Sequence, residues 1–317
     1  MPLKTVGDQP PLILLAGPTA IGKSALALRL WERLHGAAEI VSVDSAQIYR
    51  GMDIGTAKPD AATRERVPHH LLDLLDPAET YSAARFSADA HTVIAAIRAR
   101  HCTPILVGGS MLYFRALLYG LSRLPAADPA LRARLEDEAR SSGWAVLHQR
   151  LATHDPQTAA RLHPNDVQRI QRALEILELT GEPPSRLYAC GREHAGLGDW
   201  RGYALMPADR AVLHQRVELR FQQMMTAGLL DEVRRLHGRG DLNTGLPALR
   251  AVGYRQLWAY LDGLCSLDEA GQRAVAATRQ YAKRQMTWLR AETAFEWIDA
   301  AEPNAIDVVL THLKAGR

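Results

Sequence analysis

The chain has 317 residues, of which 47% are hydrophobic and 23% charged, proportions that are ordinary for a globular protein with a large core. This length fits one large domain with an insertion, or two domains. The formal net charge of +3 gives the whole chain only a weak bias toward anionic partners, so a nucleic-acid site requires local clustering of charge. The three cysteines, Cys102, Cys190 and Cys265, form no CxxC pair, which argues against a zinc site or a disulfide framework.

The amino terminus, MPLKTVGDQPPL, contains no apolar segment of signal length. No run in the chain approaches the roughly 20 apolar residues that a membrane span requires. We therefore expect a cytoplasmic protein that does not associate with membranes.

The first third of the chain alternates short apolar runs with helical patterns. Strands are expected at LILLAG, EIVSVDS and PILVGGS, and helices from Ser24 to about Leu34 and from Ser82 to Arg100. This alternation is typical of an α/β fold, a parallel sheet with helices on both faces. Ligands bind at the carboxyl ends of such strands, which gives three candidate site loops: Gly17 to Ser24, the loop from Asp44, and Gly108 to Ser110.

The first of these loops, GPTAIGKS, has the GxxxxGK[ST] spacing of a phosphate-binding loop, with the required strand before it and helix after it. Its backbone N–H groups surround phosphate oxygens, Lys23 adds positive charge, and Ser24 offers a hydroxyl to Mg²⁺. Such a loop recognises an anionic pyrophosphoryl group, not what that group is attached to.

Two further segments carry polar side chains after strands. Asp44 ends a strand near the phosphate loop, where it could bind Mg²⁺ or act as a general base, or simply cap a turn. The residues from Gly51 to Pro59 predict an ordered loop. Ser110 follows two glycines and can donate to an oxygen. The paired histidines of PHHLLD lack further ligands at zinc spacing, so a packing or surface role is expected.

The strands disappear after about Leu124. Residues 125–199 show helical periodicity broken by prolines and glycines, which predicts an all-helical insertion domain, whereas 1–124 plus 200–317 form the sheet-containing core. RGYALMP predicts one more strand, and two amphipathic helices interrupted at Gly228 follow it. Arg216 and Arg220 share one face of the first, with solvated charge as the default interpretation.

A basic helix, QRAVAATRQYAKRQMTWLR, lies near the carboxyl terminus and interleaves arginines and a lysine with Tyr281 and Trp288. Cationic side chains neutralise phosphates while aromatic side chains stack on bases, so this helix is a candidate RNA-binding surface. Alternatively, it balances the acidic stretch LEDEAR of the insertion. The polar side of NDVQRIQRALEIL fits a functional surface and an ordinary solvated helix face equally well.

Taken together, GPTAIGKS, DSAQIYRGMDIGTAKP, PHHLLD, GGSMLYF, RAVGYRQLW and ATRQYAKRQMTWLR resemble the IPP transferase family of tRNA-modifying prenyltransferases. The resemblance runs in order from about Leu12 to Arg290. It implies a P-loop NTPase-like fold and transfer of a dimethylallyl group from dimethylallyl diphosphate to N6 of the adenosine 3′ to the anticodon. The expected tRNAs read codons that begin with U, and diphosphate is released without consumption of a nucleoside triphosphate.

The resemblance also assigns roles to residues. It implies Asp44 as the general base, with Ser110 and Arg220 acting on the departing diphosphate. It places the diphosphate on Gly17, Thr19, Ala20, Gly22, Lys23 and Ser24, with Mg²⁺ near Ser24. It implies tRNA contacts at Asp44, Ser45, Ala46 and Gln47; at Gln168, Arg169, Ile170, Gln171 and Arg172; at Arg250, Ala251, Val252, Gly253, Tyr254 and Arg255; and at Lys283, Arg284, Gln285, Met286, Thr287, Trp288, Leu289 and Arg290.

On this interpretation the helical insertion clamps the anticodon stem-loop, and the protein acts as a monomer. Two other functions stay open from the residues alone. A small-molecule or nucleoside kinase would use the same loop, with Asp44 on Mg²⁺ or a hydroxyl. A nonenzymatic RNA-binding protein would explain the basic helices but would leave Asp44 without a role.

Overall fold

The computed structural model describes residues 11–189, 196–302 and 305–315, so Cys190 and residues 1–10 lie outside it. Contacts within the chain divide it into two compact units. The core unit comprises Met1–Leu117 and Gly196–Arg317, and the helical unit comprises Leu118–Ala195. The boundaries expected from the sequence, 125 and 199, lie a few residues further along the chain.

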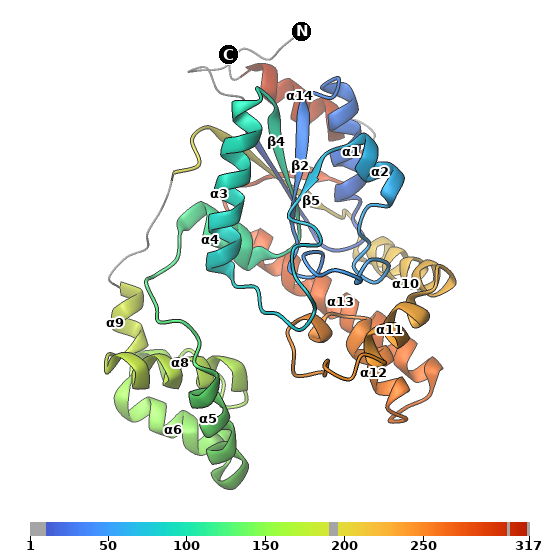
Figure 1. The fold of residues 1–317 in the computed structure, drawn as a ribbon. Coiled ribbons are helices and arrows are strands. Elements are labelled where there is room, and N and C mark those ends of the chain that lie inside the picture. The colour runs from blue at the N-terminus through green and yellow to red at the C-terminus, as the bar shows by residue number, and fades with distance from the viewer. Residues whose placement is uncertain (1–10, 190–195, 303–304, 316–317) are drawn as a thin grey trace. The chain divides into compact units, whose positions relative to one another are not determined.

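A six-stranded parallel sheet with strand order β3-β2-β4-β1-β5-β6 forms the centre of the core unit (Figure 1). Its strands are β1 (Leu12–Ala16), β2 (Ala38–Val43), β3 (His69–His70), β4 (Thr103–Gly108), β5 (Trp200–Met206) and β6 (Glu296–Asp299). Every residue of β1, β2 and β4 is buried, as expected for strands covered by helices. The predicted α/β fold is confirmed.

The sequence does not predict β3 and β6. β3 consists of two histidines, and β6 has four residues of which two are acidic, so neither produces an apolar run that stands out from its surroundings. The histidines of β3 have structural contacts: His69 Nδ1 lies 2.7 Å from the carbonyl oxygen of Val67, and His70 Nε2 lies 2.6 Å from Glu39 Oε2.

The core unit also contains most of the helices. They are α1 (Lys23–Arg33), α2 (Ala61–Arg66), α3 (Ala83–Ala99), α4 (Met111–Tyr119), α10 (Arg210–Thr226), α11 (Leu229–His237), α12 (Tyr254–Leu261), α13 (Leu267–Ala291) and α14 (Ala305–Ala315), with a 3-10 turn at Ala248–Arg250. The predicted interruption at Gly228 is confirmed, because α10 ends and α11 begins on either side of it. α13 extends the predicted basic helix backward to a capping box formed by Ser266 and Glu269. No helix among the described residues is both long and apolar enough to cross a bilayer.

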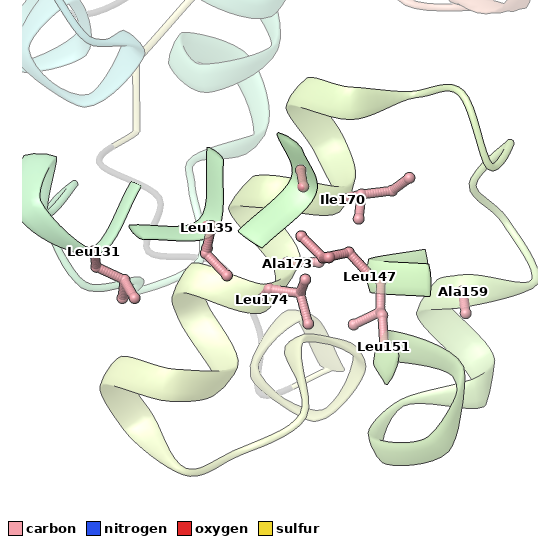
Figure 2. Packing of buried hydrophobic residues seen from close by; sticks show 9 residues of the cluster. Leu131, Leu135, Leu147, Leu151, Ala159, Ile170, Ala173 and Leu174 are labelled. Carbon is pink, nitrogen blue, oxygen red and sulfur yellow. The ribbon is translucent and has the colours of Figure 1, made fainter. Parts of the chain in front are cut away.

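The helical unit consists of α5 (Pro129–Ser142), α6 (Trp144–His154), α7 (Pro156–Ala159), α8 (Val167–Thr180) and α9 (Pro184–Ala189). Asp128 and Asp155 cap α5 and α7 through backbone N–H groups, at 3.0 and 2.9 Å. Leucines of α5, α6 and α8 form its own hydrophobic core, and Figure 2 shows Leu135, Leu147 and Leu174 within it. The helices pack as the periodicity predicts.

The acidic stretch LEDEAR lies on α5 and makes its contacts within the helical unit. Glu138 pairs with Arg150 at 2.9 Å, Glu136 accepts a hydrogen bond from Gln171 at 3.0 Å, and Asp137 pairs with Arg140. These acidic side chains already have basic or amide partners nearby. The basic helix α13 is therefore not needed to balance them.

Candidate active site

Three candidate loops meet at one edge of the sheet. They follow β1, β2 and β4, and β4 lies between the other two strands. Because the strands are parallel, their carboxyl ends lie at the same edge. Asp44, which follows β2, thus reaches the phosphate loop across one intervening strand, and Asp44 and Thr19 line the same cavity.

This cavity has a volume of about 380 Å³ and lies within the core unit. Its polar lining includes Thr19, Asp44, Thr56, Arg220, Tyr281 and Arg284. Its apolar wall includes Val217, Phe221, Met224, Leu229 and Val252. The cavity therefore offers both cationic groups and an apolar surface, which suits a small anion that carries a short hydrocarbon chain.

The phosphate loop leads into a helix N-terminus that has no side-chain cap. Gly22 is the N-cap of α1 and has a φ of +107°, a left-handed conformation that glycine adopts without strain. It supplies no side-chain cap, and the first turn of α1 contains no acidic residue. The N–H groups and the positive end of the helix dipole together favour a phosphate at this position.

Two cations lie beside one carboxylate at this loop. Lys23 Nζ donates to the carbonyl oxygen of Pro18 at 2.8 Å. Burial, and secondarily the charge of Arg220, lower the pKa of Lys23 to about 7, while Asp44 acts in the opposite direction. Burial also lowers the pKa of Arg220, an effect that Asp44 partly offsets. A bound anion would relieve this excess of positive charge.

Hydrogen bonds within the loop after β2 orient Asp44. Its Oδ1 accepts the N–H of Ala46 at 2.8 Å. Ser110, in the loop between β4 and α4, is buried, and its Oγ accepts the N–H of Ser45 at 2.9 Å. The structure thus brings Ser110 to the Asp44 loop, and Ser110 is not among the described residues that line the cavity.

The residues of α13 expected to contact tRNA divide into two groups. Lys283, Arg284, Thr287 and Arg290 are exposed, and Trp288 is half-buried. Gln285, Met286 and Leu289 are buried at 3%, 1% and 0% exposure, so the structure leaves their side chains no surface for RNA. A helix that packs against the protein core buries one of its faces. Consecutive residues therefore fall on both the buried and the exposed face, and only some residues of a contiguous range can contact RNA.

The segment Arg250 to Arg255 shows the same division. Arg250, Ala251, Val252 and Gly253 line the cavity, and Arg255 is exposed. Tyr254 is completely buried. Asp44, Ser45 and Ala46 line the same cavity, whereas the side chain of Gln47 points to its own loop, with Nε2 donating to the carbonyl oxygens of Thr56 and Ala57 at 3.1 and 3.2 Å.

In the helical unit, the stretch from Gln168 to Arg172 lies near the start of α8. Ile170 belongs to the hydrophobic core (Figure 2), Gln171 donates to Glu136, and Arg172 pairs with Glu175 at 2.5 Å. Gln168 is exposed, and so is Arg169, which pairs with Asp166 at 2.5 Å. Only the first two residues of this stretch thus present their side chains fully to solvent.

Several cavity residues carry no recognisable sequence signal for a role in this site. Val217, Phe221, Met224 and Leu229 follow ordinary helical periodicity, so their place in the apolar wall depends on tertiary packing. Tyr281 is recognisable only as an aromatic in a basic helix, and its hydroxyl donates to the carbonyl oxygen of Gly109 at 3.3 Å.

The fold and the loop define a P-loop-type α/β protein, in which the loop lies beside a cavity with one polar and one apolar wall. A family model described as IPP transferase matches residues 47–292, and the chain belongs to this family. It is 57% identical to the tRNA dimethylallyltransferase of Alkalilimnicola ehrlichii over 285 residues, which cover 89% of this chain and 88% of that protein. It is 57% identical to the tRNA dimethylallyltransferase of Bordetella petrii, with 93% and 94% covered.

Solved structures agree with this assignment. The tRNA isopentenylpyrophosphate transferase of Bacillus halodurans is 37% identical, with a TM-score of 0.68 and 96% of each chain covered. A eukaryotic dimethylallyltransferase, described as acting on tRNA, is 26% identical and has a TM-score of 0.76, with 96% of this chain and 77% of that chain covered.

Proposed function

We propose that the chain transfers the dimethylallyl group of dimethylallyl diphosphate to N6 of the adenosine 3′ to the anticodon, in tRNAs that read codons beginning with U. The observation that carries the proposal is the single cavity in which Asp44, Arg220 and Thr19 meet an apolar wall. Relatives named as tRNA dimethylallyltransferases at 57% identity support it.

The reaction forms a bond between adenine N6 and the allylic carbon while the bond from that carbon to the diphosphate oxygen breaks. The N6 lone pair is delocalised into the ring, so a base that removes a proton from N6 assists the attack. We assign this role to Asp44. Its Oδ1 is held by the N–H of Ala46, and Oδ2 would receive the proton.

The departing diphosphate gathers negative charge, which groups at the phosphate loop stabilise where it develops. We assign this role to Arg220 and to the residues of the phosphate loop, namely Gly17, Thr19, Ala20, Gly22, Lys23 and Ser24. The N–H of Thr19 donates to Gln285, so Thr19 would contact the diphosphate through its hydroxyl. Ser110 is better assigned to holding the Asp44 loop.

We propose Mg²⁺ as the metal ion. Mg²⁺ prefers six oxygen ligands and keeps several waters. The described residues contain no group of three His, Cys, Asp or Glu side chains that could hold a metal, and Ser24 offers an exposed hydroxyl in the first turn of α1. This donor set fits an ion held mainly by the diphosphate and water, with Ser24 as the protein ligand. Bound there, Mg²⁺ would neutralise charge on the leaving group.

The tRNA partner is proposed to contact both units. In the core unit the exposed Lys283, Arg284 and Arg290 of α13 would neutralise phosphates, and in the helical unit Gln168 and Arg169 would contact the anticodon stem-loop. The target adenine must leave its stack to enter the cavity. We propose that the chain acts as a monomer, in the cytoplasm where tRNA is found.

The test is transfer of radiolabel from dimethylallyl diphosphate to an unmodified tRNA transcript that reads a U-initial codon, with Mg²⁺ present and ATP absent. We expect label on the adenosine 3′ to the anticodon and none in a transcript that carries guanosine there. Absence of label, together with hydrolysis of ATP when it is added, would contradict the proposal and favour a kinase.

A further inference from the structure

A buried carboxylate on α11 holds the loop that follows β2. Glu232 is 1% exposed. Its Oε2 accepts the N–H groups of Asp53 and Ile54, at 2.9 and 2.8 Å. Its Oε1 accepts the N–H of Gly55 at 3.1 Å and the hydroxyl of Tyr254 at 2.5 Å. A carboxylate offers about four acceptor sites, so four donors satisfy it and compensate its buried charge.

The loop held in this way is pressed against two helices and forms part of the cavity wall. A Cβ on Gly55 would lie 2.5 Å from the ring of Tyr254 and 2.8 Å from Leu229, so a larger residue would have to displace these side chains. Gly55 and its neighbour Thr56 both line the cavity. Glu232 therefore fixes a wall of the site without lining it.

Hydrogen bonds continue from this loop to Asp44. Gln47 Nε2 donates to the carbonyl oxygens of Thr56 and Ala57, at 3.1 and 3.2 Å, which anchors Gln47 to the loop. Ser42 Oγ donates to Gln47 Oε1 at 2.7 Å, so the amide is held at both ends. The backbone N–H of Gln47 lies 3.4 Å from Asp44 Oδ1, beside the shorter bond from Ala46.

We propose that Glu232 is a positioning residue for the transfer reaction: it fixes residues 53–57 and, through Gln47, the orientation of the Asp44 carboxylate. The inference rests on the proposed function, because it concerns how the base is aimed at the acceptor adenine. Loss of positioning should lower kcat, since reaction rates are sensitive to small displacements of a catalytic group. The phosphate loop follows a different strand, so KM for dimethylallyl diphosphate should change little.

The first test variant is Glu232→Gln. Its amide NH₂ replaces one acceptor oxygen and faces donors, so two of the four donors lose their acceptor. We expect kcat to fall by about 10- to 100-fold with KM for dimethylallyl diphosphate within about twofold, and amide exchange of residues 53–55 to accelerate. The control is Asp231→Asn, the same chemical change at the adjacent exposed residue, which pairs with Arg234. It should leave kcat and exchange unchanged.

The second variant, Tyr254→Phe, removes one donor and keeps the three backbone bonds. We expect kcat to fall by about threefold. If Glu232→Gln does not fold, the kcat of Tyr254→Phe tests the proposal in its place. Wild-type kcat in a folded variant, or a loss that only follows the unfolded fraction, would overturn the proposal. If the wild-type protein transfers no label, the proposed function fails, and amide exchange at residues 53–55 still shows whether Glu232 holds the loop.

Discussion

The backbone N–H of Thr19 donates to Oε1 of Gln285 across 2.9 Å, which ties the phosphate loop to α13. The other end of this buried amide, Nε2, donates to the carbonyl oxygen of Gly109 at 2.8 Å. Gln285 therefore joins the loops that follow β1 and β4. α13, whose exposed face is proposed to bind tRNA, thus supports the phosphate loop through its buried face.

Replacing Gln285 with alanine should loosen the phosphate loop. The N–H of Thr19 would lose its partner, and the carbonyl of Gly109 would keep only the longer bond from the Tyr281 hydroxyl, at 3.3 Å. A buried group left unpaired costs about 1–3 kcal/mol of stability. We expect KM for dimethylallyl diphosphate to rise by about tenfold, because the loop must then be ordered by its ligand. Steady-state kinetics and urea unfolding measure the two effects.

A matched control is Gln280→Ala, which removes an exposed glutamine of the same helix. It should leave both quantities unchanged. Equal effects of the two substitutions would show that the tie to Thr19 contributes nothing beyond general helix stability.

The depressed pKa of Lys23 predicts how stability varies with pH. The folded-state value of about 7 lies below the ordinary value of 10.5, so between these pH values the unfolded chain binds more protons and stability rises with pH. Below pH 7 both states are charged and the full cost of burial remains. We expect Lys23→Met to be more stable than wild type near neutral pH, with the difference shrinking toward pH 10.5 in urea unfolding. A difference independent of pH would contradict the assignment.

The same group should take up a proton when diphosphate binds. An anion beside Lys23 favours its charged form, so binding above the folded pKa of about 7 draws a proton from the buffer. We expect calorimetric titrations with dimethylallyl diphosphate at about pH 8.5, in buffers of different ionisation enthalpy, to show uptake approaching one proton. Uptake by Lys23→Met equal to that of wild type would assign the proton to another group.

Lys283 is expected to contact a tRNA phosphate. Its replacement by alanine should weaken tRNA binding and reduce the slope of log affinity against log salt by about one unit, since one fewer counterion is released. Arg273→Ala is the control, because Arg273 pairs with Glu269 near the start of the same helix, at 3.0 Å. If the slope for Lys283→Ala equals that of wild type, Lys283 makes no phosphate contact.

The elements that the sequence predicts correctly are those whose signal is local. β1, β2 and β4 are continuous apolar runs, and the phosphate loop combines fixed spacing with a strand before it and a helix after it. The family assignment is confirmed because its motifs are long and occur in order along the chain. β6 is not predictable in the same way, because its pairing with β5 depends on distant residues.

Site residues are harder to predict where one segment has both a buried face that packs on the core and an exposed face that can bind a partner. The carboxyl-terminal motif marks α13 as important, but spacing alone does not separate the exposed Lys283 from the buried Gln285. Glu232 stands in an amphipathic helix among other charged residues, and nothing local distinguishes it from the exposed Asp231. Its role becomes visible only when residues 53–55, far away in sequence, are seen to donate to it.

We propose that the carboxylate of Asp44 removes the proton from adenine N6 in this cavity. The most direct measurement compares Asp44→Ala with wild type in single-turnover transfer, with tRNA affinity measured in parallel. We expect the rate of Asp44→Ala to be lower by about 10²- to 10⁴-fold, with tRNA affinity changed by much less. An equal loss of rate and affinity would contradict it, because Asp44 would then contribute to binding the tRNA and not to the chemical step.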